Sequence, residues 1–317
     1  MWSNSALYRS KRGWDCGEGM KKAEVKGERW ISLVIKLSGY SSILFVTLIL
    51  IFLLREGLPA LGEQPLSKLF GTRWYAITDL YGLWPLIAGS LLVTIGAALI
   101  GVPIGIGTAV YLSELSPLWI KNILKPVIEI LAGLPSVVLG FLGIRLLAPF
   151  FREALNLSTG LTAFTGAVLL GFISVPTIVS IAEDALNTVP PGFRHGARAL
   201  GATQWQTIWG VTVPAARSGL LTAVMLGVGR TIGETMAVMM VTGNAPVLPH
   251  GLDALFLPVR TMTATIASEM GEVASGSPHY HVLFFIGIVL FSFSLGINLA
   301  ASSYTLRAKK RSERLLS

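Results

Sequence analysis

Six long apolar segments constrain this chain more than any other feature of its sequence. Crossing ~30 Å of hydrocarbon takes about 20 apolar residues in a helix, and segments of that kind lie at 31–54, 83–112, 123–150, 160–181, 218–241 and 282–304. Only 13% of the residues are charged, whereas a soluble domain carries about 25%. The sequence therefore predicts an all-α integral membrane protein with six transmembrane helices. The second and third segments contain Pro103, Pro126 and Pro135, which predict a tilt or kink.

Basic residues near the ends of the segments predict the orientation. Lys and Arg in short flanking regions are retained on the cytoplasmic side. With the amino terminus inside, that side collects the basic residues of both tails and of the longest inner loop, together with Lys121 and Lys125. The other side keeps Arg55, Lys68, Arg73, Arg152 and Arg260. Both termini are therefore predicted to be cytoplasmic. The juxtamembrane clusters also account for the net charge of +8 without a nucleic-acid partner.

Motifs of enzymes and metal proteins are missing. No GxxxxGK[ST], HExxH or GxSxG occurs, and the loops are too short for a catalytic domain, so no catalytic residue is predicted. A lone cysteine, Cys16, excludes an intrachain disulfide and a CxxC metal site. His279 and His281 lack further ligands at suitable spacing, so they predict a solvated loop or the start of a helix and no metal site.

The loop between the fourth and fifth segments contains residues that typically start and end helices. A short helix is expected at 193–200, Gly201 can take the left-handed turn that ends it, and a second helix is expected at 202–209. Arg194 and Arg198 are four residues apart and share one side of the first helix. The pattern alone fits a compact docking structure and a loop on the lipid headgroups equally well.

This loop resembles the EAA loop of permease subunits of ATP-binding-cassette importers, whose pattern is E-A-A, three residues, G and, further on, I-x-L-P. Ala197, Gly201 and Pro214 carry the likeness, while His195 stands where the glutamate is usual and Gly196 where the first alanine is. In that family the loop docks into a groove of the ATP-hydrolysing subunit. The resemblance therefore implies contacts to the ATPase from Arg194, His195, Ala197, Arg198, Gly201 and Ala202.

Two further runs, "IEILAGLPSVVLGFLG" at 128–143 and "GVGRTIGETMAVMMVTGNAP" at 227–246, resemble the membrane subunits of the high-affinity phosphate importer, the PstC-type more than the PstA-type. The resemblance implies the type I importer (MetI-like) permease fold in a bacterial inner membrane. It implies four kinds of partner: a homologous PstA-type permease subunit, two copies of an ATP-binding subunit, an extracytoplasmic phosphate-binding protein and the lipid bilayer. No cofactor would bind this chain, since ATP and Mg would belong to the ATPase.

The predicted organisation follows from these boundaries. It consists of a cytoplasmic N-terminal tail (1–29), a first transmembrane helix (30–54), a periplasmic loop (55–82), a permease core of five transmembrane helices (83–305) and a cytoplasmic C-terminal tail (306–317). The core contains a coupling loop at about 183–216 and a periplasmic loop at about 243–281. We expect that outer loop either to be a partly ordered surface loop or to cover the outer mouth.

Arg230 and Glu234 lie inside the fifth apolar segment. Arg230 is 13 residues beyond Arg217, or about 20 Å of helix, which places it near the midplane of the bilayer. A charge there costs at least ~2.5–3.5 kcal/mol, so it must face protein or a water-filled path and have a partner. Glu234, one turn on, is the predicted partner.

Two interpretations of this pair stay open on the residues alone. One is a structural ion pair between helices, and the other is an anion path in which the guanidinium fork meets phosphate oxygens. The resemblance favours the path. Gly229 and Gly233 form a GxxxG motif that predicts close packing of another helix, and Glu129, near the inner end of the third segment, is a candidate gate.

Three rival functions remain. An importer of another oxyanion, molybdate or sulfate, would use the same fold. A secondary transporter would carry internal repeats with broken helices, and no convincing repeat is present in the sequence. A membrane sensor of phosphate status would signal through Arg194 and Arg198 without needing flux.

Overall fold

The computed structural model describes residues 26–316 of the chain. Most of the predicted N-terminal tail, including Cys16, lies outside the described residues. The chain divides into two units, 1–52 and 53–317. The first unit contains α1 (Lys26–Gly57) up to residue 52, and the second contains the rest of the described chain.

The second unit is almost entirely helical. In chain order its elements are α2 (Ala60–Glu63), α3 (Leu66–Leu69), β1 (Trp74–Tyr75), η2 (Ala76–Thr78), β2 (Leu80–Tyr81), α4 (Trp84–Val110), η3 (Tyr111–Leu115), α5 (Leu118–Gly133), α6 (Ser136–Leu142), η4 (Gly143–Leu147), α7 (Ala148–Ala154), α8 (Ala163–Asn187), α9 (Pro191–Ala199), α10 (Gln204–Thr207), η5 (Ile208–Thr212), α11 (Val213–Gly233), α12 (Met236–Val241), η6 (Leu252–Phe256), α13 (Met262–Glu269) and α14 (Pro278–Leu316). The turns η3, η4 and η5 are π-helical, and each continues a longer helix. The strands β1 and β2 form one antiparallel hairpin, in which Trp74 pairs with Tyr81.

Among the described residues, five helices are long and apolar enough to cross a membrane, and a sixth span results if the bent pair α5 and α6–α7 counts as one. This agrees with the prediction of six spans. The pair bends by 96° at Leu134 and Pro135, where both residues are extended. Pro135 disfavours a helical conformation at Leu134 and cannot donate a helical hydrogen bond, so the predicted kink is a full break.

The expected single helix at 218–241 is wrong, because two helices occupy that segment. α11 ends at Gly233, Glu234 is extended (φ −66°, ψ 129°), and α12 begins at Met236. Gly233 has low helix propensity, and the Thr235 hydroxyl donates to its carbonyl at 3.2 Å, a local bond that competes with the helical one. The Thr263 hydroxyl donates to the Glu234 carbonyl at 3.0 Å, which satisfies part of the broken backbone.

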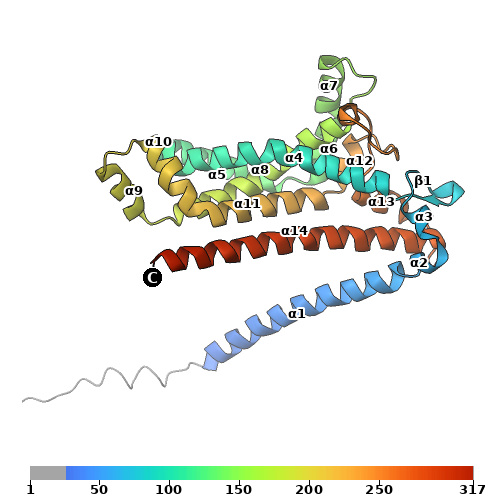
Figure 1. Ribbon diagram of the computed structural model, residues 1–317, viewed down its shortest axis with the longest axis horizontal. Helices are drawn as coiled ribbons and strands as arrows, with labels where there is room; N and C mark the ends of the chain where they lie inside the picture. The colour runs from blue at the N-terminus through green and yellow to red at the C-terminus, as the bar shows by residue number, and fades with distance from the viewer. Residues whose placement is uncertain (1–25, 317) are drawn as a thin grey trace, which may run out of the picture. The chain divides into compact units, whose positions relative to one another are not determined.

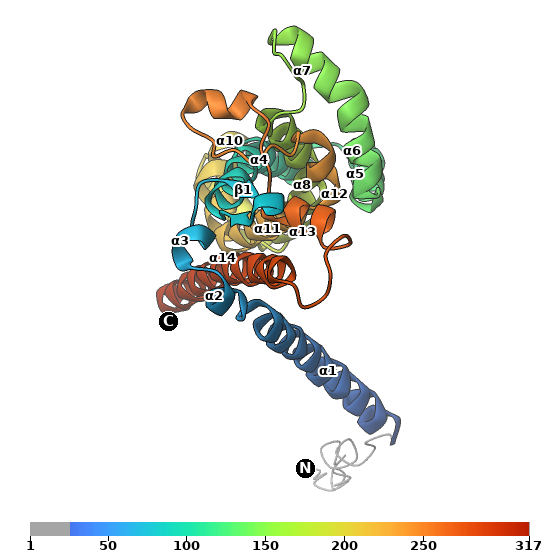
Figure 2. The ribbon, with the colours of Figure 1, turned by 90° about the vertical axis from the view of Figure 1, so that its right-hand side faces the viewer.

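Glycines let α4 and α8 approach closely. A Cβ on Gly101 would lie 2.3 Å from the Ser174 Oγ and 2.8 Å from the Gly171 carbonyl oxygen, and a Cβ on Gly105 would lie 2.7 Å from Ile178. α11 also packs closely on α8, since a Cβ on Gly227 of α11 would meet Ile178 of α8. Figures 1 and 2 show α4, α8 and α11 side by side, and these three helices contact one another.

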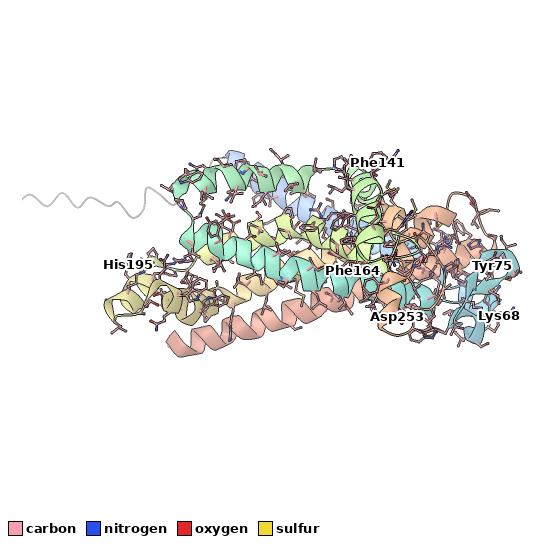
Figure 3. The ribbon with its side chains drawn as sticks, turned by 90° about the horizontal axis from the view of Figure 1, so that it is seen from above. Lys68, Tyr75, Phe141, Phe164, His195 and Asp253 are labelled. Carbon is pink, nitrogen blue, oxygen red and sulfur yellow. The ribbon has the colours of Figure 1, made fainter. Side chains whose placement is uncertain are left out.

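The two ends of this helical unit differ. His195 lies at one end with α9 and α10, whereas Lys68, Tyr75 and Asp253 lie at the opposite end with the β1–β2 hairpin (Figure 3). The predicted outer loop at 243–281 belongs to this second end. It contains η6 and α13, and in α13 the residues from Met262 to Thr265 are buried. Within this segment, α13 is therefore packed against the core, whereas most residues between 271 and 276 are exposed.

We predict that valine at Gly101 destabilises the fold, whereas valine at Gly107 of the same helix does not. A side chain at Gly101 collides with α8, while a Cβ on Gly107 meets no atom within 4 Å. Overpacking of this kind costs about 1–3 kcal/mol. Thermal unfolding of the purified chain in detergent, followed by tryptophan fluorescence, should give a lower Tm for G101V than for G107V. Equal Tm values would contradict the close contact between α4 and α8.

Candidate functional site

Arg230 lies in the last turn of α11 and contacts three other segments. Its Nη1 donates to the Thr177 Oγ1 of α8 at 3.0 Å, and its Nη2 makes a long contact of 3.5 Å with the carbonyl oxygen of Ala132, near the end of α5. The Nε lies 3.7 Å from the Glu234 Oε1. The predicted pair therefore meets across the break between α11 and α12, at ion-pair distance. Thr177 and Ala132 are partners that the sequence did not indicate.

Glu234 also borders a small cavity. Its side chain is 13% exposed, and it lines a cavity of about 10 Å³, which is close to the volume needed for one water molecule. The hydroxyl residues around this cavity are Ser90, Thr94, Thr231, Thr261 and Thr263. The cavity therefore has about the volume of one water molecule and hydroxyl-bearing residues in its lining.

The surroundings of Arg230 leave its guanidinium available to an anion. Its side chain is 33% exposed, its short contact is to a neutral hydroxyl, and its contact with the carboxylate is longer than a hydrogen bond. Charge-assisted bonds from a guanidinium to an oxyanion are stronger and are often bidentate. An oxyanion that reaches this site can therefore replace the present partners with better ones.

Gly229 and Gly233 do not make the close helix contact predicted for them within this chain. Apart from the backbone of their own helix, no atom lies within 4 Å of a Cβ built on either residue. The close contact is made instead by Gly227, two residues before Gly229, against Ile178. Among residues 53–316, the space beside Gly229 and Gly233 is therefore not filled by another helix.

Glu129, the candidate gate, is exposed on α5. Within residues 26–316 no hydrogen bond or ion pair of its side chain occurs, so the structure assigns it no gating contact.

The loop at 183–216 forms a compact structure at one end of the bundle, as Figure 1 shows for α9 and α10. We call residues 191–207, which comprise both helices and the turn between them, the knob. Gly201 has φ +87°, which confirms the predicted left-handed turn, and Thr203 and Gln206 form a capping box at the start of α10. Large apolar side chains of the knob and the following turn are exposed, with Leu200 90% accessible; the others are Phe193, Trp205 and Trp209. His195 and Arg198 are also exposed.

Arg194 does not share an outward face with Arg198. Its side chain turns back into the protein and forms an ion pair with Glu114 of η3, with 2.6 Å between Nη2 and Oε1. Helical spacing placed the two arginines on one side, but the buried Glu114 and the free carbonyls at the end of α8 attract Arg194 alone. Arg194 therefore makes a contact within the chain that the sequence did not indicate, and its contact with an ATPase stays a prediction.

Sequence reasoning missed the buried carboxylate Glu183, which is 1% exposed in α8. Lys121 Nζ lies 2.7 Å from Glu183 Oε1, Lys125 Nζ lies 3.6 Å from Oε2, and the Asn187 amide donates at 3.4 Å. These contacts join the start of α5 to the end of α8. The run "AEDALN" signals a helix end, but nothing in it identifies lysines about sixty residues earlier.

A second polar cluster lies at the opposite end, around Glu269. This carboxylate accepts hydrogen bonds from the Trp74 indole at 3.0 Å and from the His279 imidazole at 2.8 Å, and it forms an ion pair with Arg260 at 2.9 Å. Burial, and then the hydrogen bond to Asp79, raises the pKa of the nearby Tyr81 to about 12. The Tyr81 hydroxyl therefore stays protonated, and it donates to the Asp79 Oδ1 at 3.0 Å. His279 lies at the start of α14, which agrees with the predicted role of the histidines. Over the described residues, no group of three potential metal ligands is present.

Comparison with known proteins adds the family. Residues 101–309 match the family described as binding-protein-dependent transport system inner membrane component. Over 252 residues the chain is 43% identical to a probable ABC transporter permease protein, YqgH, of Bacillus subtilis, with 78% of this chain and 80% of that protein covered. It is 36% identical to the phosphate transport system permease protein PstC of Haemophilus influenzae, with 71% and 76% covered.

Solved structures of low sequence identity share the fold. An inward-facing structure of the MetNI methionine ABC transporter matches with a TM-score of 0.56 at 20% identity, covering 71% of this chain and 97% of the matched chain. A bacterial ABC transporter involved in the import of alginate matches with a TM-score of 0.54 at 15% identity, covering 88% and 99%. These matches agree with the predicted type I importer fold.

We predict that Glu183→Gln lowers the stability of the chain by about 1.5–3 kcal/mol, the usual contribution of a hydrogen bond to a charged group. The change leaves Lys121 without its buried counter-charge. Glu153→Gln is the matched control, because Glu153 is exposed on α7 and makes no ion pair among residues 26–316. Thermal unfolding in detergent measures both variants. If the two unfold at the same temperature, Glu183 does not hold α5 to α8.

Proposed function

This chain belongs to the family of binding-protein-dependent transport system inner membrane components, and from that membership we propose that it conducts inorganic phosphate. Its family role is that of a permease subunit of an ATP-binding-cassette importer, a multi-pass protein of the inner membrane that does not itself hydrolyse ATP. An ATPase and a binding protein are the partners that this role requires. Phosphate as the transported ion, and Arg230 as the residue that meets it, are the proposal.

The surroundings of Arg230 are the observation that carries the proposal. A guanidinium near the predicted bilayer midplane is costly unless it has a partner or a purpose. Its short hydrogen bond goes to a neutral hydroxyl of Thr177 at 3.0 Å, which is a weaker partner than a phosphate oxygen. Several relatives are named as phosphate permeases, among them proteins that are 36% and 35% identical to this chain.

Glu234 gives the site a way to release the anion and to select it. Its carboxylate lies 3.7 Å from the Arg230 Nε, close enough to neutralise the guanidinium when the path is empty. A protonated phosphate also carries a hydroxyl group, which can donate a hydrogen bond to this carboxylate. Sulfate at neutral pH has no such hydrogen and would be repelled by the carboxylate. The pair therefore favours phosphate over sulfate.

The knob is the proposed docking surface for the ATPase. Exposed apolar residues Phe193, Leu200 and Trp205 supply a surface whose burial would drive association, and His195 and Arg198 supply polar contacts at its edge. Ala197, Gly201 and Ala202 complete the candidate set. A PstA-type permease subunit, two ATPase copies and an extracytoplasmic phosphate-binding protein are the proposed partners. ATP binding would draw the ATPases together and shift the path between inward-facing and outward-facing states.

The experiments must also distinguish phosphate transport from two other functions. Molybdate or sulfate would use the same guanidinium, so competition for uptake separates them from phosphate. A sensor of phosphate status would need the knob but not the path. A chain that no longer transports but still signals would separate these two roles.

We predict that Arg230→Gln lowers ATP-dependent uptake of radiolabelled phosphate about tenfold or more, in vesicles that contain the complete complex. The expected loss follows from removal of a charged hydrogen-bond donor, worth about 1.5–3 kcal/mol. Arg230→Lys keeps the charge but not the fork, so it should transport at an intermediate rate. Arg152→Gln, an exposed arginine of α7, is the control for loss of one positive charge.

Unlabelled sulfate and molybdate are added in excess in the same experiment. Uptake by the unaltered chain should survive both competitors. Inhibition by either ion would overturn phosphate as the substrate, and full uptake by R230Q would overturn Arg230 as the site.

We predict that Thr177→Val lowers phosphate uptake about fivefold, whereas Thr177→Ser leaves it nearly unchanged. Valine keeps the shape of the side chain but removes the hydroxyl that orients the guanidinium, and an intramolecular hydrogen bond typically contributes about 1 kcal/mol. Initial uptake rates per assembled complex measure the difference. Equal rates for the valine and serine variants would show that the hydroxyl is not needed.

A further inference from the structure

The π-helical turn η3 at the end of α4 is a junction between four segments. The Ser113 hydroxyl contacts the Asn187 side chain at the end of α8 at 3.0 Å, and Glu114 receives hydrogen bonds from both helices of the knob. Glu114 is the most buried charged group of the junction, with its side chain 4% exposed. π-helical turns are rare and are frequent at functional sites.

Every nitrogen of the Arg194 guanidinium donates a hydrogen bond, either to Glu114 or to a backbone carbonyl near the end of α8. Nε and Nη2 donate to the Glu114 Oε1 at 3.0 and 2.6 Å. Nη1 donates to the Val189 carbonyl at 2.7 Å, and Nη2 also donates to the Leu186 carbonyl at 2.8 Å. Those carbonyls lie at the end of α8, where backbone oxygens lack helical partners. Arg194 therefore fixes α9 to both α4–η3 and α8.

A second hydrogen bond attaches the other half of the knob to the same residue. The Gln204 amide of α10 donates to the backbone carbonyl of Glu114 at 2.9 Å. A displacement of either α9 or α10 is therefore transmitted to one point on η3. The exposed face of the knob carries Phe193 and Leu200 instead, so the surface offered to a partner and the contact to the helices are on different residues.

We propose that Arg194 and Glu114 form a clamp through which movement of the knob reaches α4 and α8. Arg194 is then a positioning residue that acts through Glu114, and it is not a contact to the ATPase. The close packing of α4 on α8 at Gly101 and Gly105 lets the two helices move as one body. α8 also carries Thr177, about ten residues and ~15 Å of helix from its end, so the same movement reaches the partner of Arg230.

The clamp is inferred from the family role of the chain as a permease coupled to an ATPase, and it does not depend on which ion is transported.

The test of the clamp uses complete complexes in vesicles with the cognate binding protein, and phosphate is the first ion supplied. The readout is the factor by which the ion-loaded binding protein stimulates ATP hydrolysis, because that signal must cross the permease. If phosphate gives no stimulation with the unaltered chain, the proposed substrate fails, and the clamp is tested with sulfate and molybdate.

Two variants of the clamp are compared with one control. Arg194→Lys keeps the charge but loses the fork, and Glu114→Gln keeps the shape but loses the charge. Arg152→Lys repeats the first substitution on the exposed α7 and should change nothing. Co-purification of the ATPase with each variant measures docking separately.

The expected result is that R194K and E114Q lower the stimulation factor about fivefold or more, at the lower end of ordinary coupling between sites, while the ATPase still co-purifies in full amount. Unchanged stimulation in both variants would overturn the clamp. Stimulation that falls only in proportion to the loss of bound ATPase would also overturn it, since Arg194 would then act in docking.

Discussion

The close contact of α4 with α8 is the constraint on which the other features of the second unit depend. It exists because Gly101 and Gly105 have no side chain where the two helices meet. With α8 held there, its residues serve three purposes at three heights along one helix. Thr177 holds Arg230, Glu183 holds the lysines of α5, and the carbonyls at its end hold Arg194. In hydrocarbon, apolar side chains gain little by association, so this small-residue contact is what keeps these groups in place.

The sequence predicted the features that local patterns encode. Apolar length predicted the spans, Pro135 a kink in the third span where the structure has a full break, and Gly201 the left-handed turn of the knob. The spacing of Arg230 and Glu234 predicted their contact, because the chain stays helical up to Gly233 and Glu234 follows it directly.

Features that depend on distant parts of the chain could not be predicted in this way. The partners of Arg194 and Glu183 lie about eighty and sixty residues away, and a single sequence carries no signal of such pairs. The break after Gly233 was missed because an apolar run reads as continuous when only hydropathy is considered. Glycine and threonine on either side of Glu234 were the local signal, although both also occur inside unbroken spans.

The three π-helical turns have a consequence for the register of the helices that contain them. A π turn holds one residue more than an α turn over the same length, so every side chain that follows it is rotated about the helix axis. A stripe of apolar residues that faces the core before the turn therefore leaves that face after it, and another stripe takes its place. In η3 this rotation turns Ser113 and Glu114 away from the apolar face of α4, so that Ser113 contacts α8 and Glu114 contacts the knob. A deletion of one residue in η3 would preserve a helix of nearly the same composition, but the side chains of Ser113 and Glu114 would no longer point toward α8 and the knob.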